Sequence, residues 1–232
     1  MSIHSGHRQR LKDRFLQEGL DGFNELNALE LLLFYCIPQK DTNPLAHRLL
    51  DRFGSFHGVL DASPQELEQV EGVGANVSTF LSLIPQVDRY YYTSRTKQSA
   101  CLATNAQCAN YMVPKFRNRD NEMVYILCLD AKNKVLCCKQ LGEGSVNSAG
   151  VPIRRIVDVA MKHNATSVYL AHNHPGGVLR PSVDDIETTK RVAYALSGVD
   201  IILGDHFIVV DDEYLSMAQT GYYRQTDGVM WR

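Results

Sequence analysis

The chain has 232 residues, 44% of them hydrophobic, and a formal net charge of −2 at pH 7. This is enough chain for one large or two small globular domains, and so small a charge predicts no general attraction to nucleic acid or to membranes. No apolar run is long enough to span a bilayer, and the first residues lack the features of a signal peptide, so we expect a cytoplasmic protein with no membrane partner.

The six cysteines include no Cys-x-x-Cys pair, which disfavours a thiolate zinc site. Cys128 and Cys137 lie in or beside apolar runs typical of strands, where a free thiol behaves as a small hydrophobic group. We therefore expect reduced, buried cysteines in a reducing compartment.

The first part of the chain has the periodicity of helices. A basic amphipathic segment covers residues 6–16, and residues 27–35 form a second helical pattern with Asn27 as a candidate cap. Residues 42–54 carry a proline in the first turn and a glycine at the end, and residues 63–66, Ser-Pro-Gln-Glu, match a capping box. These signals predict an all-α domain.

Residues 67–81 are two short apolar-periodic segments joined by Gly72-Val73-Gly74, and they resemble the helix-hairpin-helix motif. In that motif the glycine turn exposes backbone amides that can hold a DNA phosphate without reading sequence. Gly72 and Gly74 are therefore candidates for a weak DNA contact. The turn lacks the lysines that often follow it in DNA-binding versions, so an all-α packing unit is an equally good interpretation.

The composition changes after the three tyrosines at 90–92, where residues 93–99 are polar and have no helical or strand period. We expect a helical domain at 1–95, a linker at 96–103 and a second domain at 104–232.

The second domain alternates strand and helix signals in the order β-β-α-β-α-β-β after an initial helix, which predicts a mixed sheet with helices packed on it. The fold class is therefore α+β, with an all-α domain followed by a mixed α/β domain. The expected elements are a helix capped by Thr104, strands at 123–129 and 135–141, a helix at 156–163, a strand at 166–171, a helix from Ser182 to about 197, and strands at 199–203 and 207–210.

A candidate metal site follows the strand at 166–171. Alternate residues of an extended chain point to the same side, so His172 and His174 can present both imidazoles to one ion. Ser182 has the position of a helix N-cap, and Asp185 in the first turn can point back toward the histidines. Together these residues form a plausible three-ligand site.

With Glu122 at the head of the strand at 123–129, this pattern resembles the JAMM motif of MPN-domain metalloproteases. More closely, His-Asn-His-Pro-x-Gly, Pro-Ser-x-x-Asp, the upstream Glu-x-x-x-x-Leu-x-Leu-Asp and the helical first half resemble the RadC family of bacteria. The resemblance covers nearly the whole chain. It implies a JAB/MPN domain, whose sheet is comparable to that of cytidine deaminases.

The resemblance also implies the chemistry. Zn²⁺ would be held by His172, His174 and Asp185, and Glu122 would activate a water bound to it, for hydrolysis of an amide or isopeptide bond in a peptide substrate. Ser182 would hydrogen-bond the developing oxyanion, or serve only as a helix cap, or do both.

Two stretches depart from the family pattern. Pro152-Ile-Arg-Arg155 stands where relatives usually carry His-Pro-Arg-Glu, and Pro175-Gly-Gly177 stands where they usually read His-Pro-Ser-Gly. Both changes bear on substrate recognition rather than on the proposed ligands. Asp205-His206 matches a family pair that could orient a ligand, although ordinary structural roles are the simpler interpretation.

Two alternatives remain. The chain could be a DNA-associated accessory protein with a structural metal site, although acidic residues slightly outnumber basic ones in residues 1–100. A zinc deaminase is disfavoured because that class needs His-x-Glu and Pro-Cys-x-x-Cys, which are absent here.

Overall fold

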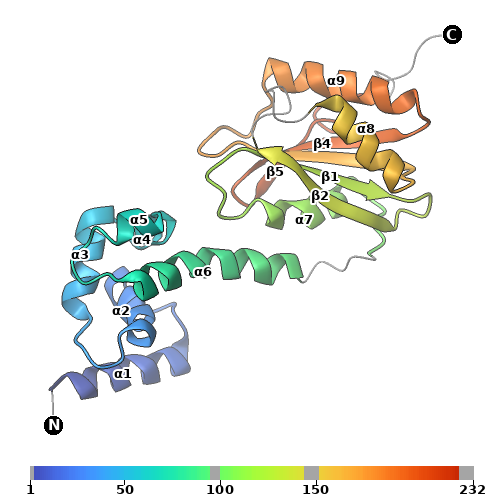
Figure 1. Cartoon of the computed structure of the whole chain (residues 1–232). Helices are drawn as coiled ribbons and strands as arrows, with labels where there is room; N and C mark the ends of the chain where they lie inside the picture. The colour runs from blue at the N-terminus through green and yellow to red at the C-terminus, as the bar shows by residue number, and fades with distance from the viewer. Residues whose placement is uncertain (1–2, 95–99, 144–151, 225–232) are drawn as a thin grey trace. The chain divides into compact units, whose positions relative to one another are not determined.

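The computed structural model describes residues 3–94, 100–143 and 152–224. The chain divides into two compact units, Met1–Asp88 and Arg89–Arg232 (Figure 1). The first unit is helical and the second contains a mixed sheet, which confirms the expected α+β class. Within the described ranges, no helix combines the length and the apolar character needed to cross a lipid bilayer.

The first unit packs short helices around a core of leucines and valines. Its helices are α1 (Ile3–Glu18), α2 (Glu25–Cys36), α3 (Asn43–Phe53), α4 (Phe56–Asp61), α5 (Pro64–Leu67) and the first part of α6 (Ala75–Ser94). The prediction of Asn27 as the cap of α2 is wrong. The cap is Asn24, whose side chain accepts a hydrogen bond from the Asn27 N–H.

Local signals explain several of these helix ends. Gly54 ends α3 with a φ of 82°, in the left-handed region that glycine adopts without strain. Ser63 and Glu66 form the predicted capping box at α5. Gly72 also has a positive φ, of 96°, in the turn that leads to α6.

Helix α6 continues to Ser94, so the tyrosines at 90–92 are helical. Residues 95–99, which include the first part of the predicted linker at 96–103, lie outside the described residues. Beyond them, Cys101 pairs with Lys134 as an isolated bridge and Leu102 is buried in the second unit. The predicted domain limits stay a prediction.

The second unit has three layers (Figure 1). Its five-stranded sheet has the order β2-β1-β3-β4-β5, and the β3–β4 pair is parallel while the other neighbours are antiparallel. Helices α8 and α9 cover one face and α7 covers the other. The elements are α7 (Asn105–Met112), the 3-10 helix η1 (Val113–Lys115), β1 (Met123–Leu129), β2 (Val135–Glu143), α8 (Ile153–Lys162), β3 (Ser167–Asn173), α9 (Val183–Ser197), β4 (Ile202–Val210) and β5 (Glu213–Ser216).

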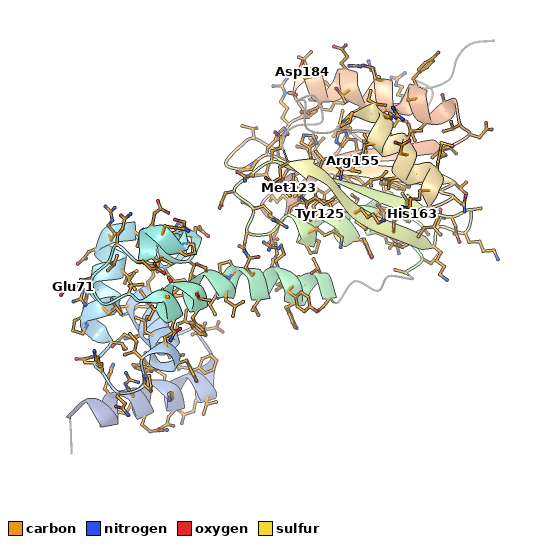
Figure 2. The ribbon with its side chains drawn as sticks, in the orientation of Figure 1. Glu71, Met123, Tyr125, Arg155, His163 and Asp184 are labelled. Atoms are coloured by element: carbon orange, nitrogen blue, oxygen red, sulfur yellow. The ribbon has the colours of Figure 1, made fainter. Side chains whose placement is uncertain are left out.

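Strand β1 is apolar along its whole length because both of its faces are covered. Val124 and Ile126 pack toward α8 and α9, whereas Met123 and Leu127 pack toward α7. Tyr125 lies on the α7 side with Met123 (Figure 2). The core therefore holds the start of β1, one residue after Glu122, firmly within the sheet.

The prediction of two strands at 199–203 and 207–210 is wrong, because a single strand, β4, runs from Ile202 to Val210 and residues 199–201 precede it. Val168 of β3 lies opposite Leu203, but Tyr169 lies opposite Asp205, so Gly204 is an extra residue in a β-bulge. A Cβ on Gly204 would lie 2.4 Å from the Tyr169 ring, which explains why a glycine occupies this position.

All six cysteines are free thiols. Cys108 and Cys128 are buried as expected. The expectation is wrong for Cys101, which is exposed, and for Cys36, Cys137 and Cys138, which are half-buried. Cys101 lies outside the named strands, where its backbone pairs with Lys134 as an isolated bridge.

Candidate metal centre

The candidate site is assembled where β3 ends and α9 begins. His172 is the sixth residue of β3 and lies opposite Val124 of β1, two residues from Glu122. The chain then turns through residues 175–181, where Gly176 has a φ of 61°, and enters α9 at Val183. Sheet pairing therefore brings residues about 50 positions apart in the chain together.

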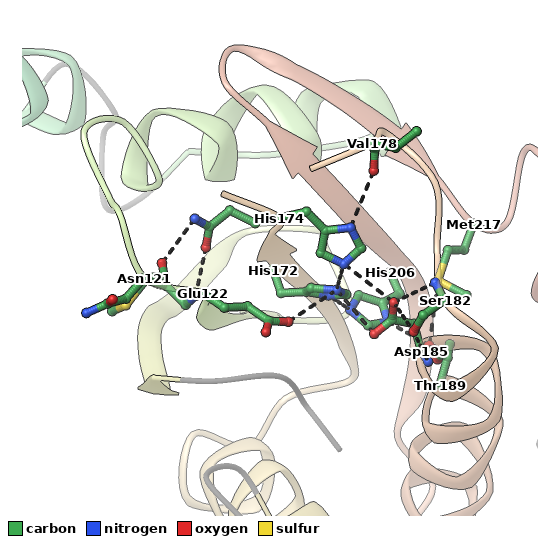
Figure 3. A network of polar contacts seen from close by, with 12 residues as sticks. Asn121, Glu122, His172, His174, Val178, Ser182, Asp185, Thr189, His206 and Met217 are labelled. Atoms are coloured by element: carbon green, nitrogen blue, oxygen red, sulfur yellow. Dashed lines mark hydrogen bonds and ion pairs between the residues drawn. The ribbon is translucent and has the colours of Figure 1, made fainter. Parts of the chain in front are cut away.

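The predicted residues converge around Nε2 of His172. This atom lies 2.9 Å from Nε2 of His174, 3.2 Å from Oδ1 of Asp185 and 3.9 Å from Oε1 of Glu122. Nε2 of His174 is 3.5 Å from the other Asp185 oxygen. One ligand atom from each of Glu122, His172 and His174 lies within 4.8 Å of the others (Figure 3).

Ser182 caps α9 as predicted and fixes Asp185. The Ser182 Oγ accepts a hydrogen bond from the Asp185 N–H at 3.0 Å, while Asp185 Oδ2 accepts from the Ser182 N–H at 2.8 Å and from its hydroxyl at 2.7 Å. This capping box orients the carboxylate so that Oδ1 faces His172. Burial would raise the pKa of Asp185, but hydrogen bonds with His172 and His174 outweigh it and hold that pKa well below its usual range.

A buried chain of hydrogen bonds sets the orientation of His172. Its Nδ1 lies 2.8 Å from Nε2 of His206, whose Nδ1 lies 2.6 Å from Oγ1 of Thr189. The Thr189 hydroxyl has one proton, which it donates to the Asp185 carbonyl at 2.6 Å, so it accepts from His206. Burial holds the pKa of His206 well below its usual value. Neutral His206 then accepts from the Nδ1–H of His172, leaving the Nε2 lone pair directed at the centre.

The proton on the His174 ring is assigned by the same reasoning as for His172. Its Nδ1 lies 3.4 Å from the carbonyl oxygen of Val178, an acceptor, so Nδ1 carries the proton and Nε2 again faces the centre. The hydrogen bond with Asp185 raises the pKa of His174. Burial raises the pKa of Glu122, although the two histidines oppose that shift.

These donors fit a zinc ion. Two imidazole nitrogens 2.9 Å apart, with carboxylate oxygens beside them, require either a proton or a cation between them. Imidazole and carboxylate are zinc ligands, and catalytic zinc sites use three protein ligands. The gathered group, Glu122, His172 and His174, contains no cysteine, unlike the sites of zinc deaminases.

Comparison with known proteins agrees with this geometry. The family described as RadC-like JAB domain matches residues 102–222. The chain belongs to the RadC family. Its relatives include UPF0758 proteins of Fusobacterium nucleatum subsp. nucleatum (33% identity, 94% of this chain and 97% of the relative), Ruegeria pomeroyi (33%, 93% and 96%) and Rhodobacter capsulatus (34%, 91% and 99%).

Three residues of this RadC-family site were not among the predicted site residues. Thr189 lies four residues after Asp185, on the same face of α9, and that spacing was a usable signal. Of the pair at 205–206, only His206 reaches the centre. Asp205 instead accepts from the backbone N–H groups of His206 and Ala218 and from the Asn105 side chain.

The third is Asn173, between the two histidines, whose side chain bonds the backbone on both sides of Glu122. The departures from the family pattern lie at the surface. Arg154 at the start of α8 is 90% exposed and 3.8 Å from Asp158, and Gly176 and Gly177 are exposed. Gly72 and Gly74 belong to the first unit.

Proposed function

We propose that the protein is a zinc-dependent hydrolase that cleaves an amide or isopeptide bond in a peptide substrate. The convergence of the Nε2 atoms of His172 and His174 with the buried Asp185 carboxylate is the observation that carries this proposal. His172, His174 and Asp185 would hold the ion. Bound there, zinc would supply a Lewis acid that polarises a carbonyl group and lowers the pKa of a water molecule.

The two carboxylates have different environments, which supports different roles. The Asp185 side chain is 3% exposed and lies 3.2 Å from Nε2 of His172, as suits a ligand. The Glu122 side chain is 26% exposed and lies 3.9 Å from the same atom, which leaves it open to water and substrate. Glu122 would take a proton from the attacking water and deliver it to the leaving amine nitrogen.

The capping box also leaves a role for Ser182. Its backbone N–H holds Asp185 Oδ2 independently of the hydroxyl. The hydroxyl could therefore turn toward a substrate oxygen and donate a hydrogen bond to the developing negative charge without releasing Asp185.

Zinc content and peptide cleavage test the proposal together. Wild type and Glu122→Gln should each purify with about one zinc, because tight binding by His172, His174 and Asp185 remains. Each protein is incubated with a library of peptides and lysine isopeptides. Mass spectrometry should detect cleavage products with wild type alone. Zinc-loaded wild type that cleaves no library member, or a Glu122→Gln variant as active as wild type, would contradict it.

We also propose a weak DNA contact through the first unit, as in the helix-hairpin-helix motif. The observation that favours it is Arg48 of α3, whose Nε donates to the Glu71 carbonyl at 3.1 Å. Its Nη2 lies 3.2 Å from the position of a Cβ on Gly72. An exposed arginine therefore supplies, beside the glycine turn and the start of α6, the positive charge that residues 75–76 lack.

Gel retardation of the full-length protein at low salt tests this contact. Arg48→Ala should weaken retardation of a duplex of arbitrary sequence and reduce the dependence of log K on log salt by about one unit. Asp51→Ala, at another exposed position of α3, is the charge-changing control. Absence of wild-type retardation at low salt would refute the contact.

A further inference from the structure

The sheet does not itself hold Glu122. The antiparallel register of β1 and β3 ends with Val124 opposite His172, and β1 begins at Met123. Glu122 therefore precedes the strand, and its backbone lies beyond the β1–β3 pairing. A residue in this position is ordinarily less restrained than one inside a sheet.

The side chain of Asn173 continues the connection where the backbone pairing ends. Its Oδ1 accepts a hydrogen bond from the Met123 N–H at 2.7 Å, and its Nδ2 donates to the Asn121 carbonyl at 3.2 Å. The two bonds hold the peptide groups on either side of Glu122. Asn173 is 5% exposed, so water competes little for these bonds.

We propose that Asn173 is a positioning residue that holds the Glu122 carboxylate at the metal centre. The inference rests on the proposed metal function and adds a residue to it. Side chains alternate between the two faces along β3. His172 and His174 therefore face the metal centre, while Asn173 between them points away from it and contacts β1. The same three residues then fix both the ligands and the acid opposite them.

The chemistry of the bonds explains why an amide stands here. The Met123 N–H needs an acceptor and the Asn121 carbonyl needs a donor. An asparagine side chain offers one acceptor and one donor group at the required separation. An aspartate would still accept from Met123 but would place a carboxylate oxygen against the Asn121 carbonyl. An alanine would leave both backbone groups without their partner.

A double-mutant cycle on zinc affinity tests the proposal. Because Glu122 places a negative charge close to both histidine ligands, Glu122→Ala should weaken zinc binding roughly tenfold while binding stays stoichiometric. Asn173→Ala should weaken it by about tenfold in wild type, yet should have no further effect when Glu122 is already alanine. Competition with a chromophoric chelator gives these affinities without any enzymatic assay.

Hydrogen exchange of the Met123 amide in the metal-free protein supplies a second readout. Exchange should accelerate in Asn173→Ala and stay slow in Asn173→Asp, which keeps the acceptor. Asn105→Ala, which removes another side-chain bond between elements of the same unit, is the matched control and should show no coupling to Glu122→Ala.

Additive effects of the Asn173 and Glu122 substitutions, or a Glu122→Ala variant with wild-type affinity, would overturn the inference. Wild type that binds zinc, shows the coupling and cleaves no peptide would instead overturn the proposed hydrolase and leave the role of Asn173 standing.

Discussion

Replacing Thr189 by valine tests the buried hydrogen-bond chain behind His172. Valine keeps the branched shape and removes the hydroxyl, so the Nδ1–H of His206 loses its acceptor in a site with no exposed surface. The Asp185 carbonyl keeps its backbone bond within α9. One buried polar group is therefore orphaned, which should cost about 1–3 kcal/mol of unfolding free energy in the metal-free protein.

The effect on metal binding should separate valine from serine. Without the acceptor on Thr189, His206 no longer holds His172 in the form whose Nε2 lone pair faces the centre, and zinc affinity should fall about 10–100-fold. Thr189→Ser keeps the hydroxyl, loses one methyl group worth about 1 kcal/mol of stability and should bind zinc as wild type does. Urea unfolding and chelator competition measure the two quantities.

A Thr189→Val variant whose zinc affinity lies within twofold of that of Thr189→Ser would refute the orientation of His172 by this chain. Equal unfolding free energies for the two variants and wild type would refute the buried hydrogen bond itself.

Three further predictions concern the scaffold. Hydrogen bonds from two backbone N–H groups of the β1–β2 turn lower the pKa of Asp130, so its stabilising effect is present above the unfolded-state pKa and is lost as pH falls through the folded-state pKa. The difference in urea midpoint between wild type and Asp130→Ala should therefore shrink on acidification below about pH 4. Gly204→Ala should lower the unfolding free energy by about 1–3 kcal/mol, because the new methyl group displaces the Tyr169 ring. Ser63→Ala should cost about 1 kcal/mol by removing the cap shared with Glu66, measured by thermal unfolding.

Local signals accounted for most elements and for the gathered site residues. Ser182 and Asp185 form one turn of helix, and their cap geometry follows from a four-residue pattern. His172 and His174 share a side because strands alternate. In these cases the deciding interactions lie within a few residues, so the chain order contains them.

The wrong cap and the site residues that were not predicted depend on contacts between distant parts of the chain. Asn24 and Asn27 are both acceptable caps by residue type, and the choice depended on where α2 packs. His206 and Asn173 acquire their roles from the pairing of β3 with β4 and from the contact with β1. Such contacts join residues tens of positions apart, and periodicity along one segment carries no information about them.

The bulge at Gly204 also sets which side chains of β4 face which layer. Leu203 packs toward α8 and α9, and after the extra residue Ile208 does too, while Phe207 packs toward α7. An uninterrupted strand would instead put residues 203, 205 and 207 on one face, turning His206 away from His172. Deleting Gly204 would instead remove the bulge and place Asp205 directly after Leu203, so Leu203 and His206 would still face the same layer. With Gly204 present, the bulge is therefore what keeps His206 on the side of the sheet that carries His172.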